Sequence, residues 1–320
     1  MDFTRMLEKC VRDQWSINDL DWSLPPPALS RDKEMAVVQY FTDMAGIELL
    51  AGALFEVQRK TARDPILAKI FATFVADEKR HATVAARLAK YYDVHHYRDY
   101  VESPSLIRFR PHFLALVEQT SPEIANAYIT SGELILDVAL LRSLDDYVAD
   151  DMSHRAMHLI NRDESRHIAL DFHMTELYAS DEHLAEVRRR PRPSLRELAR
   201  GGRALVTMMW HAKPFLHEVF LAPMSHTDPS GRRVAEAFKR IQLVMRKPTV
   251  ARLPFSRFML AMQNAYNHPL AGKLFGPLLL RALGSDERAA KILFTPEEFA
   301  RSQDQSFDEM AEDALAAKYS

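Results

Sequence analysis

The sequence predicts an all-α fold, and three observations support that prediction. Apolar residues recur at intervals of three and four, the spacing of one helix face, rather than at every second position as in a strand. Glycine occurs only 9 times among 320 residues, which is few for a chain rich in turns. A lone glutamate followed 30 or 31 residues later by Glu-x-x-His occurs twice. We therefore expect two copies of a helix pair, followed by further helices.

Prolines and capping residues divide the chain into elements. A run of three prolines at 25–27 ends a short amphipathic helix expected over residues 2–17 and forms a connector. Serine or aspartate, followed in two cases by proline, is typical of a helix start, and such signals occur at Ser30, Asp64-Pro65, Ser121-Pro122 and Asp150. The expected helices span residues 31–63, 65–92, 122–149 and 152–178, with a loop over 93–103 and a helix over 104–120 interrupted near Pro111.

The chain beyond residue 180 differs from the preceding part in its pattern of prolines, basic residues and apolar stretches. A basic, proline-containing stretch at 188–193 predicts a linker. The apolar stretches at 204–210 and 276–280 could cover the bundle, form a dimer interface or touch a membrane surface, and core packing is the usual role of such stretches. Helices are expected near residues 194–221, 230–246, 254–265, 268–283, 286–293 and 296–316. The predicted organisation is a helix and connector at 1–30, a bundle at 31–178 and a helical extension at 179–320.

Composition excludes several classes of protein. A net charge of −2 argues against a nucleic-acid partner. A single cysteine, Cys10, excludes an internal disulfide framework and suits a cytoplasmic protein. The first residues lack an apolar leader, and no run approaches 18 uncharged apolar residues, so we expect neither a secretory signal nor a transmembrane segment.

The two repeated motifs have the residue types of a metal site. Residues three apart lie on one face of a helix, so each Glu-x-x-His can hold one metal ion. Four glutamates balance the charge of two divalent ions, whereas without metal they would repel one another in a buried site. Carboxylate and imidazole ligands suit iron or manganese better than structural zinc. The six candidate metal ligands are Glu48, Glu78, His81, Glu133, Glu164 and His167.

This pattern resembles that of the ferritin-like di-iron carboxylate proteins, in which two helices each supply one glutamate and two others each supply Glu-x-x-His. The resemblance covers about residues 31–178. It implies a four-helix bundle that holds two iron ions, or one manganese and one iron, with dioxygen as co-substrate. It also implies an external electron donor, such as a ferredoxin or a reductase.

The resemblance extends to the residues around the ligands. In that family, the aspartate before a motif glutamate accepts a hydrogen bond from a ligand histidine. Asp77 and Asp163 would by this resemblance each serve the histidine of the opposite motif. The alternative is that they are ordinary surface carboxylates paired with Arg80 or Arg166.

The residues one or two turns from each candidate ligand are mostly apolar, as in any bundle core or in a cavity for an organic substrate. Gly52, one turn after Glu48, would leave room for such a cavity. Asp137 and Asp171 are polar exceptions. Each is a candidate seventh ligand, proton-relay group or hydrogen-bond acceptor, or else a partner of an arginine such as Arg142.

The motifs leave four activities open. An oxygenase or hydroxylase that acts on a small or hydrophobic molecule is favoured, because a ferroxidase or storage protein needs neither an apolar face nor residues 180–320. An acyl-carrier-protein desaturase is an alternative, since residues 76–81 resemble the desaturase motif. An arylamine N-oxygenase would have an extra histidine where this chain has Ile160. An acidic carrier protein would need a basic surface, which could come from Arg188, Arg189, Arg190 and Arg192.

Overall fold

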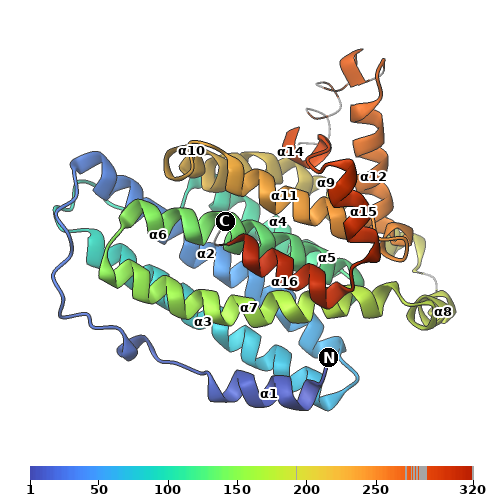
Figure 1. Ribbon diagram of the computed structural model, residues 1–320, viewed down its shortest axis with the longest axis horizontal. Helices are drawn as coiled ribbons and strands as arrows, with labels where there is room; N and C mark the ends of the chain where they lie inside the picture. Colours follow the sequence, from blue (N-terminus) through green and yellow to red (C-terminus); the bar gives the residue numbers. More distant parts are fainter. Residues whose placement is uncertain are drawn as a thin grey trace.

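The structure of the protein is a computed structural model that describes residues 1–318, apart from residues 192, 271, 275, 277, 279 and 281–286. Within these residues every regular element is a helix, so the all-α prediction is confirmed. The helix expected near 268–283 lies partly outside the described residues. Figure 1 shows the long helices running side by side, with shorter ones above and in front of them.

Four long helical stretches surround the middle of the protein. The first packs on the second and third, and the fourth packs on the second and third. Helix starts follow the expected signals: the side chains of Ser30, Asp64 and Asp150 each accept a hydrogen bond from a backbone N–H of the next turn. The stretches are α2 (Arg31–Thr61), α3 (Pro65–Tyr92), α5 (Pro122–Glu133) continued by η2 and α6 (Arg142–Val148), and α7 (Asp151–Ala179).

The third stretch contains a π-helical segment, η2 (Leu134–Leu141), which the sequence did not predict. It begins directly after Glu133. Such segments are rare and often lie at functional sites. By length and composition, Pro122–Val148 would suffice to cross a membrane, but 67% of its most apolar window is buried inside the protein. Packing in the core accounts for this apolar composition.

Helix α4 (Pro104–Val117) corrects one prediction. Pro111 lies within the helix and does not interrupt it, although a proline cannot donate the helical hydrogen bond. The residues on the inner face of α4 explain its position, because Leu106, Phe109 and Phe113 are all buried. This burial supplies a packing energy that local propensity does not include.

The N-terminal residues form helix α1 (Phe3–Arg12) and a short 3₁₀ turn, η1 (Ile17–Asp19). Helix α1 packs along α3, below it in Figure 1. The segment between α1 and η1 contains Trp15, which is buried, with 8% of its surface exposed. The connector that follows crosses to the start of α2 at the opposite end of the helices.

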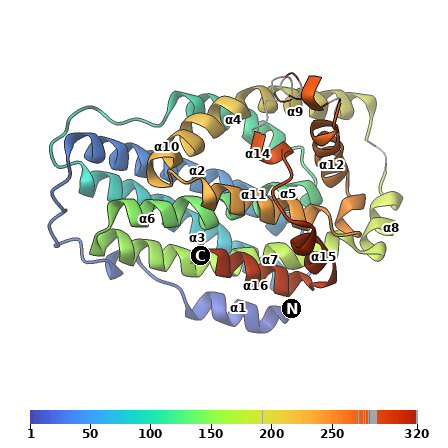
Figure 2. The same cartoon turned by 45° about the horizontal axis from the view of Figure 1, so that its top comes forward.

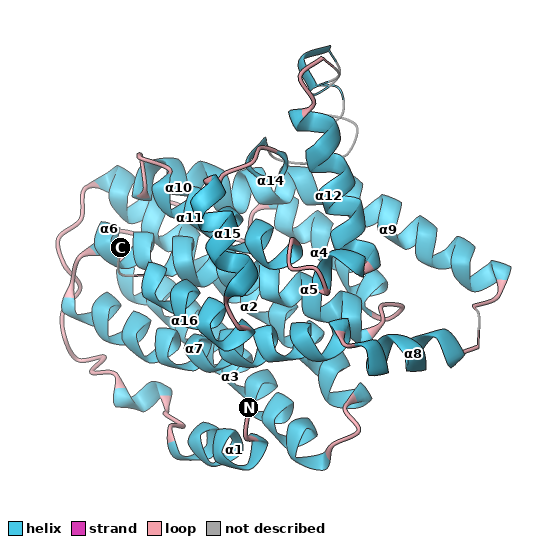
Figure 3. Cartoon of the chain, turned by 45° about the vertical axis from the view of Figure 1, so that its right-hand side comes forward, coloured by secondary structure: helices cyan, strands magenta, loops and turns pink. Residues whose placement is uncertain are grey.

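Residues beyond 180 form further helices that pack on the long ones. Helix α11 lies on η2, α16 lies on α7, and α9 lies on α4. Residues 181–189, part of which was expected as linker, form α8, because Ser180 caps a regular turn there. In Figure 3, α12 and part of α9 extend away from the other helices. The bounds are α8 (Asp181–Arg189), α9 (Leu195–Phe215), η3 (Leu216–Leu221), α10 (Ala222–Thr227), α11 (Arg232–Met245), η4 (Val250–Arg252), α12 (Pro254–Asn267), α14 (Glu287–Ala290), α15 (Pro296–Asp304) and α16 (Phe307–Ala317).

Candidate metal centre

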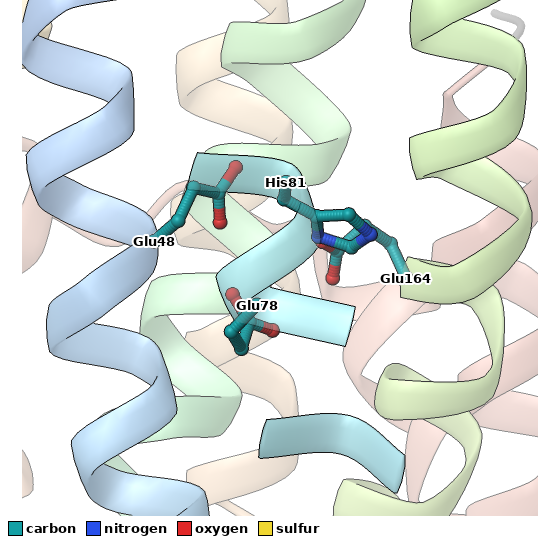
Figure 4. A group of neighbouring side chains, drawn as sticks. All are labelled: Glu48, Glu78, His81 and Glu164. Atoms are coloured by element: carbon teal, nitrogen blue, oxygen red, sulfur yellow. The ribbon is translucent and has the colours of Figure 1, made fainter. Parts of the chain in front are cut away.

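The four long stretches bring all six candidate ligands into one buried group. They form two sets of four side chains, and in each set the possible ligand atoms lie within 4.8 Å of one another. Figure 4 shows the first set converging from α2, α3 and α7. None of the six side chains is more than 2% exposed. The first set is Glu48, Glu78, His81 and Glu164, and the second is Glu78, Glu133, Glu164 and His167.

The two sets share Glu78 and Glu164. Each set combines three carboxylates with one imidazole, so each matches the donor set of an iron or manganese ion. A carboxylate that belongs to both sets has two oxygens and can bind two ions at once. The geometry therefore suits a pair of neighbouring ions better than two separate sites.

Both histidine rings direct the same nitrogen at the glutamates. Nδ1 of His81 lies 3.1 Å from Oε1 of Glu164. Nδ1 of His167 lies 3.0 Å from Oε2 of Glu164 and 3.2 Å from Oε1 of Glu78. The Nδ1 atoms are therefore the ones placed to bind metal, and Nε2 of each ring faces away from the glutamates.

Each Nε2 faces the aspartate of the opposite motif, as the family resemblance implies. Nε2 of His81 lies 3.1 Å from Oδ2 of Asp163, and Nε2 of His167 lies 3.5 Å from Oδ2 of Asp77. The first distance is that of a hydrogen bond, whereas the second is longer than a good one. A carboxylate in this position fixes the ring orientation and the tautomer.

The same aspartates also pair with the two motif arginines, but both aspartates are fully buried, so they are not the surface carboxylates of the alternative interpretation. Arg80 bonds to Asp77 and lies 3.0 Å from Asp163. Arg166 lies 2.5 Å from Asp163 and 3.6 Å from Asp77. Two cations thus alternate with two anions directly behind the histidines. Arg166, only 1% exposed, is among the largest fully buried side chains in the described chain.

Two residues of the N-terminal segment complete this network, and sequence reasoning missed both. Nε1 of Trp15 donates to Oδ2 of Asp163 at 2.6 Å. Nε2 of Gln14 donates to Oδ1 of Asp77 at 3.2 Å. Neither residue lies in a recognisable motif. They are near the centre only because α1 packs on α3, which no local pattern encodes.

Burial and repulsion shift the ionisation of the glutamates. Burial, and then the charge of Glu78, raises the pKa of Glu48 well above its usual value. Burial and the charge of Glu164 do the same to the pKa of Glu133. Burial alone would lower the pKa of His81, but the hydrogen bond to Asp163 and the negative charge of Glu164 raise it well above its ordinary value. Without metal, Glu48, Glu133 and His81 therefore hold protons more tightly than the same side chains do in water.

The pKa of Asp163, which lies behind His81, shifts in the opposite direction. Burial alone would raise the pKa of Asp163, but hydrogen bonds from His81 and Trp15 and the charge of Arg166 hold it below its usual range. Asp163 therefore stays ionised and can keep accepting from the ring of His81.

The unsatisfied atoms of the centre fit a metal pair. Both carboxylate oxygens of Glu48 and both of Glu78 are buried without a hydrogen-bond partner among the described residues. The same holds for one oxygen each of Glu133 and Glu164. Buried carboxylates without partners are costly, and coordination to a cation removes that cost.

The position of Gly52 has a different explanation from the one the sequence suggested. A Cβ atom at Gly52 would lie 3.3 Å from Cβ and 3.8 Å from Cγ of Glu78. The space is therefore occupied by the stem of a candidate ligand rather than left open. The glycine allows α2 and α3 to approach each other beside Glu78.

Aromatic rings cover the other side of the centre. The ring of Phe74 lies 4.1 Å, and that of Phe55 5.0 Å, from the ring of His167 between centroids. Phe41, Phe71 and other apolar residues of these faces are fully buried. Ile160, where an N-oxygenase would have its extra histidine, is also fully buried.

A small apolar cavity lies outside the group of candidate ligands, between α5, α7, α11 and η4. It measures about 60 Å³, and its walls include Asn126, Thr130 and Thr175. Asn126 donates to Oγ1 of Thr175 at 2.9 Å and to the carbonyl of Asp171 at 3.1 Å. The cavity thus adjoins the turn that precedes Glu133 and a part of α7 that begins two turns after His167.

Asp171 and Asp137 differ in their surroundings. Both are fully buried. Burial raises the pKa of Asp171 well above its usual value, and neither of its oxygens has a hydrogen-bond partner among the described residues. Burial therefore favours the protonated form of Asp171 over its carboxylate.

Asp137 instead forms an ion pair, with a partner that the sequence did not suggest. Its partner is Lys318, directly after α16, rather than Arg142, which lies near Asp145 and Asp146. Lys318 is only 3% exposed, and its Nζ also lies 3.4 Å from Oγ of Ser165. Burial raises the pKa of Asp137 to about 7, although the charge of Lys318 opposes that rise.

Comparisons with known protein families, with curated proteins and with solved structures found no match to this chain. The centre is therefore interpreted from its own geometry and donor chemistry.

Replacing Gly52 by alanine tests the close approach of the helices. We expect Gly52→Ala to weaken metal binding by about tenfold. The reason is that the added Cβ would push Glu78, a candidate ligand, out of its present position. Gly201→Ala is the matched control, because a Cβ there meets nothing within 4 Å. It should raise helix stability by about 0.5–1 kcal/mol and leave affinity unchanged. Equal affinities of the two variants in a metal titration would refute the proposed contact.

Breaking the buried ion pair should destabilise the metal-free protein in a pH-dependent way. Lys318→Met leaves Asp137 without its cation, so the folded-state pKa of Asp137 rises further above its unfolded value of about 3.9. Protonation of Asp137 stabilises the folded state. This stabilisation is fully present when the pH is below the unfolded-state pKa, and it is lost as the pH rises through the folded-state pKa. We expect a loss of about 3 kcal/mol in urea unfolding at pH 8 and a smaller loss at pH 6.

Adding Asp137→Leu to Lys318→Met should recover much of this stability, because no buried charge then remains. Lys69→Met, at an exposed position, is the control and should have little effect. A pH-independent loss that the double variant does not reverse would show that Lys318 acts only by packing.

Metal binding should release protons. Because Glu48, Glu133 and both histidines have raised pKa values in the metal-free site, bound cations must displace protons from them. Affinity should therefore fall as pH falls, and the slope of its logarithm against pH should equal the number of protons released. Titration in two buffers of different ionisation enthalpy measures that number. A slope of zero across neutral pH would contradict the ionisation described above.

Proposed function

We propose that the protein is a ferritin-like di-iron carboxylate enzyme that uses dioxygen to oxidise a small or hydrophobic organic molecule. The observation that carries this proposal is the convergence of two carboxylate-rich sets that share Glu78 and Glu164. The packing of α2, α3, α5–α6 and α7 around them supports a four-helix bundle.

The donor sets indicate how the ligands would divide. Glu78 and Glu164 would bridge two ions, with Glu48 and His81 on one and Glu133 and His167 on the other. Two irons, or a manganese and an iron, would supply redox chemistry toward dioxygen when bound. A catalytic cycle would also require electrons from an external donor, such as a ferredoxin or a reductase.

The chain's own residues would protect and control this chemistry. The glutamates and histidines are almost completely buried, and Phe55 and Phe74 pack on the ring of His167, so little water would reach the reacting atoms. The aspartate and arginine network would hold both imidazole rings in place. Asp171, whose pKa is raised by burial, would hold a proton that can be delivered to the centre.

The apolar surroundings favour an organic substrate over iron alone. The cavity of about 60 Å³ is small compared with ligand pockets of roughly 300 Å³ or more. To bind in this cavity, a substrate larger than a few atoms would require side chains around Asn126 to move. The identity of that molecule follows neither from the cavity nor from the motifs.

Oxygen consumption by the reduced, iron-loaded protein tests this proposal. We expect consumption that increases with an added small aromatic or aliphatic compound and yields an oxygenated product. His167→Ala should abolish both iron loading and consumption while leaving the protein helical by circular dichroism. His158→Ala, at an exposed position on the same helix, should keep both. Consumption that scales with iron(II) alone would instead indicate a ferroxidase.

A further inference from the structure

Helix α9 has an outer surface that nothing in the described chain covers. Its inner side packs on α4, where the rings of Phe215 and Phe109 stack with centroids 4.2 Å apart and Met208 is 2% exposed. Its first turns, residues 195–200, are exposed on all sides. Figure 2 shows α9 at the edge of the molecule opposite α1, and Figure 3 shows it extending outward.

The outward side chains of α9 are apolar. Leu195 and Trp210 are 85% and 80% exposed, and Val206 is 70% exposed. Residues 195, 206 and 210 are separated by multiples of a helical turn, so they share one face. Leu198 and Leu205 flank this face and are also exposed. A single exposed leucine is ordinary, but a continuous apolar ridge on a projecting helix is typical of a binding surface.

A basic flank runs beside the ridge. Arg196, Arg200 and Arg203 recur at intervals of four and three, so they lie on one side of α9. All three are exposed, and none forms an ion pair with an acidic residue of the described chain. The one acidic residue of the helix, Glu197, is bonded to Ser194 in the capping box. The outer surface of α9 is therefore apolar and positively charged.

We propose that this surface docks the protein on a bilayer that contains anionic lipids. Exposed leucine, valine and tryptophan can enter the boundary between headgroups and acyl chains, while arginines beside them contact lipid phosphates. Indole rings favour this boundary, because they are apolar with one polar N–H group. The whole chain carries a net charge of −2, so the attraction is local to α9.

A second copy of this chain suits the surface less well. In a two-fold dimer, the same face of both copies meets. Two antiparallel copies of α9 would bring the arginines of one flank close to those of the other, and like charges in contact are unfavourable. An anionic bilayer satisfies both the apolar ridge and the basic flank.

Vesicle flotation with the full chain tests the proposal. We expect binding to phosphatidylcholine vesicles that contain phosphatidylglycerol, little binding to pure phosphatidylcholine, and weaker binding at high salt. Reversing the three charges with Arg196→Glu, Arg200→Glu and Arg203→Glu should reduce the affinity for the anionic vesicles by at least about tenfold. Val206→Ser with Trp210→Ser should have a similar effect.

Matched controls lie on other faces. Val94→Ser with Val101→Ser replaces two exposed apolar residues, and Arg5→Glu with Lys9→Glu and Lys69→Glu reverses three exposed charges. Both controls should bind as the unchanged protein does, and circular dichroism should show that every variant is folded. The proposal would be overturned if the α9 variants bound anionic vesicles as well as the unchanged protein does, or if the unchanged protein did not bind them. Self-association lost on Val206→Ser with Trp210→Ser, without vesicle binding, would assign the surface to a second copy.

Discussion

The structure depends on how a helical core neutralises four buried glutamates that lie within a few ångströms of one another. Burial and mutual repulsion disfavour the charged forms of most of these groups, as the raised pKa values of Glu48, Glu78 and Glu133 show. Protons can neutralise them in the metal-free protein, and two cations can do so in the loaded one. The long helices, the buried arginines and the two histidines are arranged around that requirement.

Groups of opposite charge continue outward from the glutamates in successive shells of contacting side chains. The histidines contact the glutamates with one ring nitrogen and the aspartates Asp77 and Asp163 with the other. Arginines then balance the aspartates, and the N-terminal segment covers them with Trp15 and Gln14. On another side, Lys318 balances Asp137. Segments from both ends of the described chain thus contribute charge or hydrogen bonds to a core formed by residues 31–179.

The sequence predicted the helices from local rules, and it predicted the convergence of six side chains through the resemblance to the di-iron carboxylate proteins. Helix starts depend on caps such as Ser30 and Asp64, and Glu-x-x-His places two groups on one helix face. The contacts of Trp15 and Lys318 were not predictable, because they depend on how distant helices pack. Pro111 was misjudged for a related reason, since burial of α4 outweighs the lost hydrogen bond. The π-helical segment after Glu133 has no signal in the composition of residues 134–141.

The most direct test of the metal centre is a crystal structure of protein reconstituted with iron(II), with anomalous scattering measured at the iron edge. The account predicts two adjacent peaks, each contacted by Glu78 and Glu164 and by one of the two histidines. A map without iron between the long helices, or with a single ion away from these side chains, would contradict it.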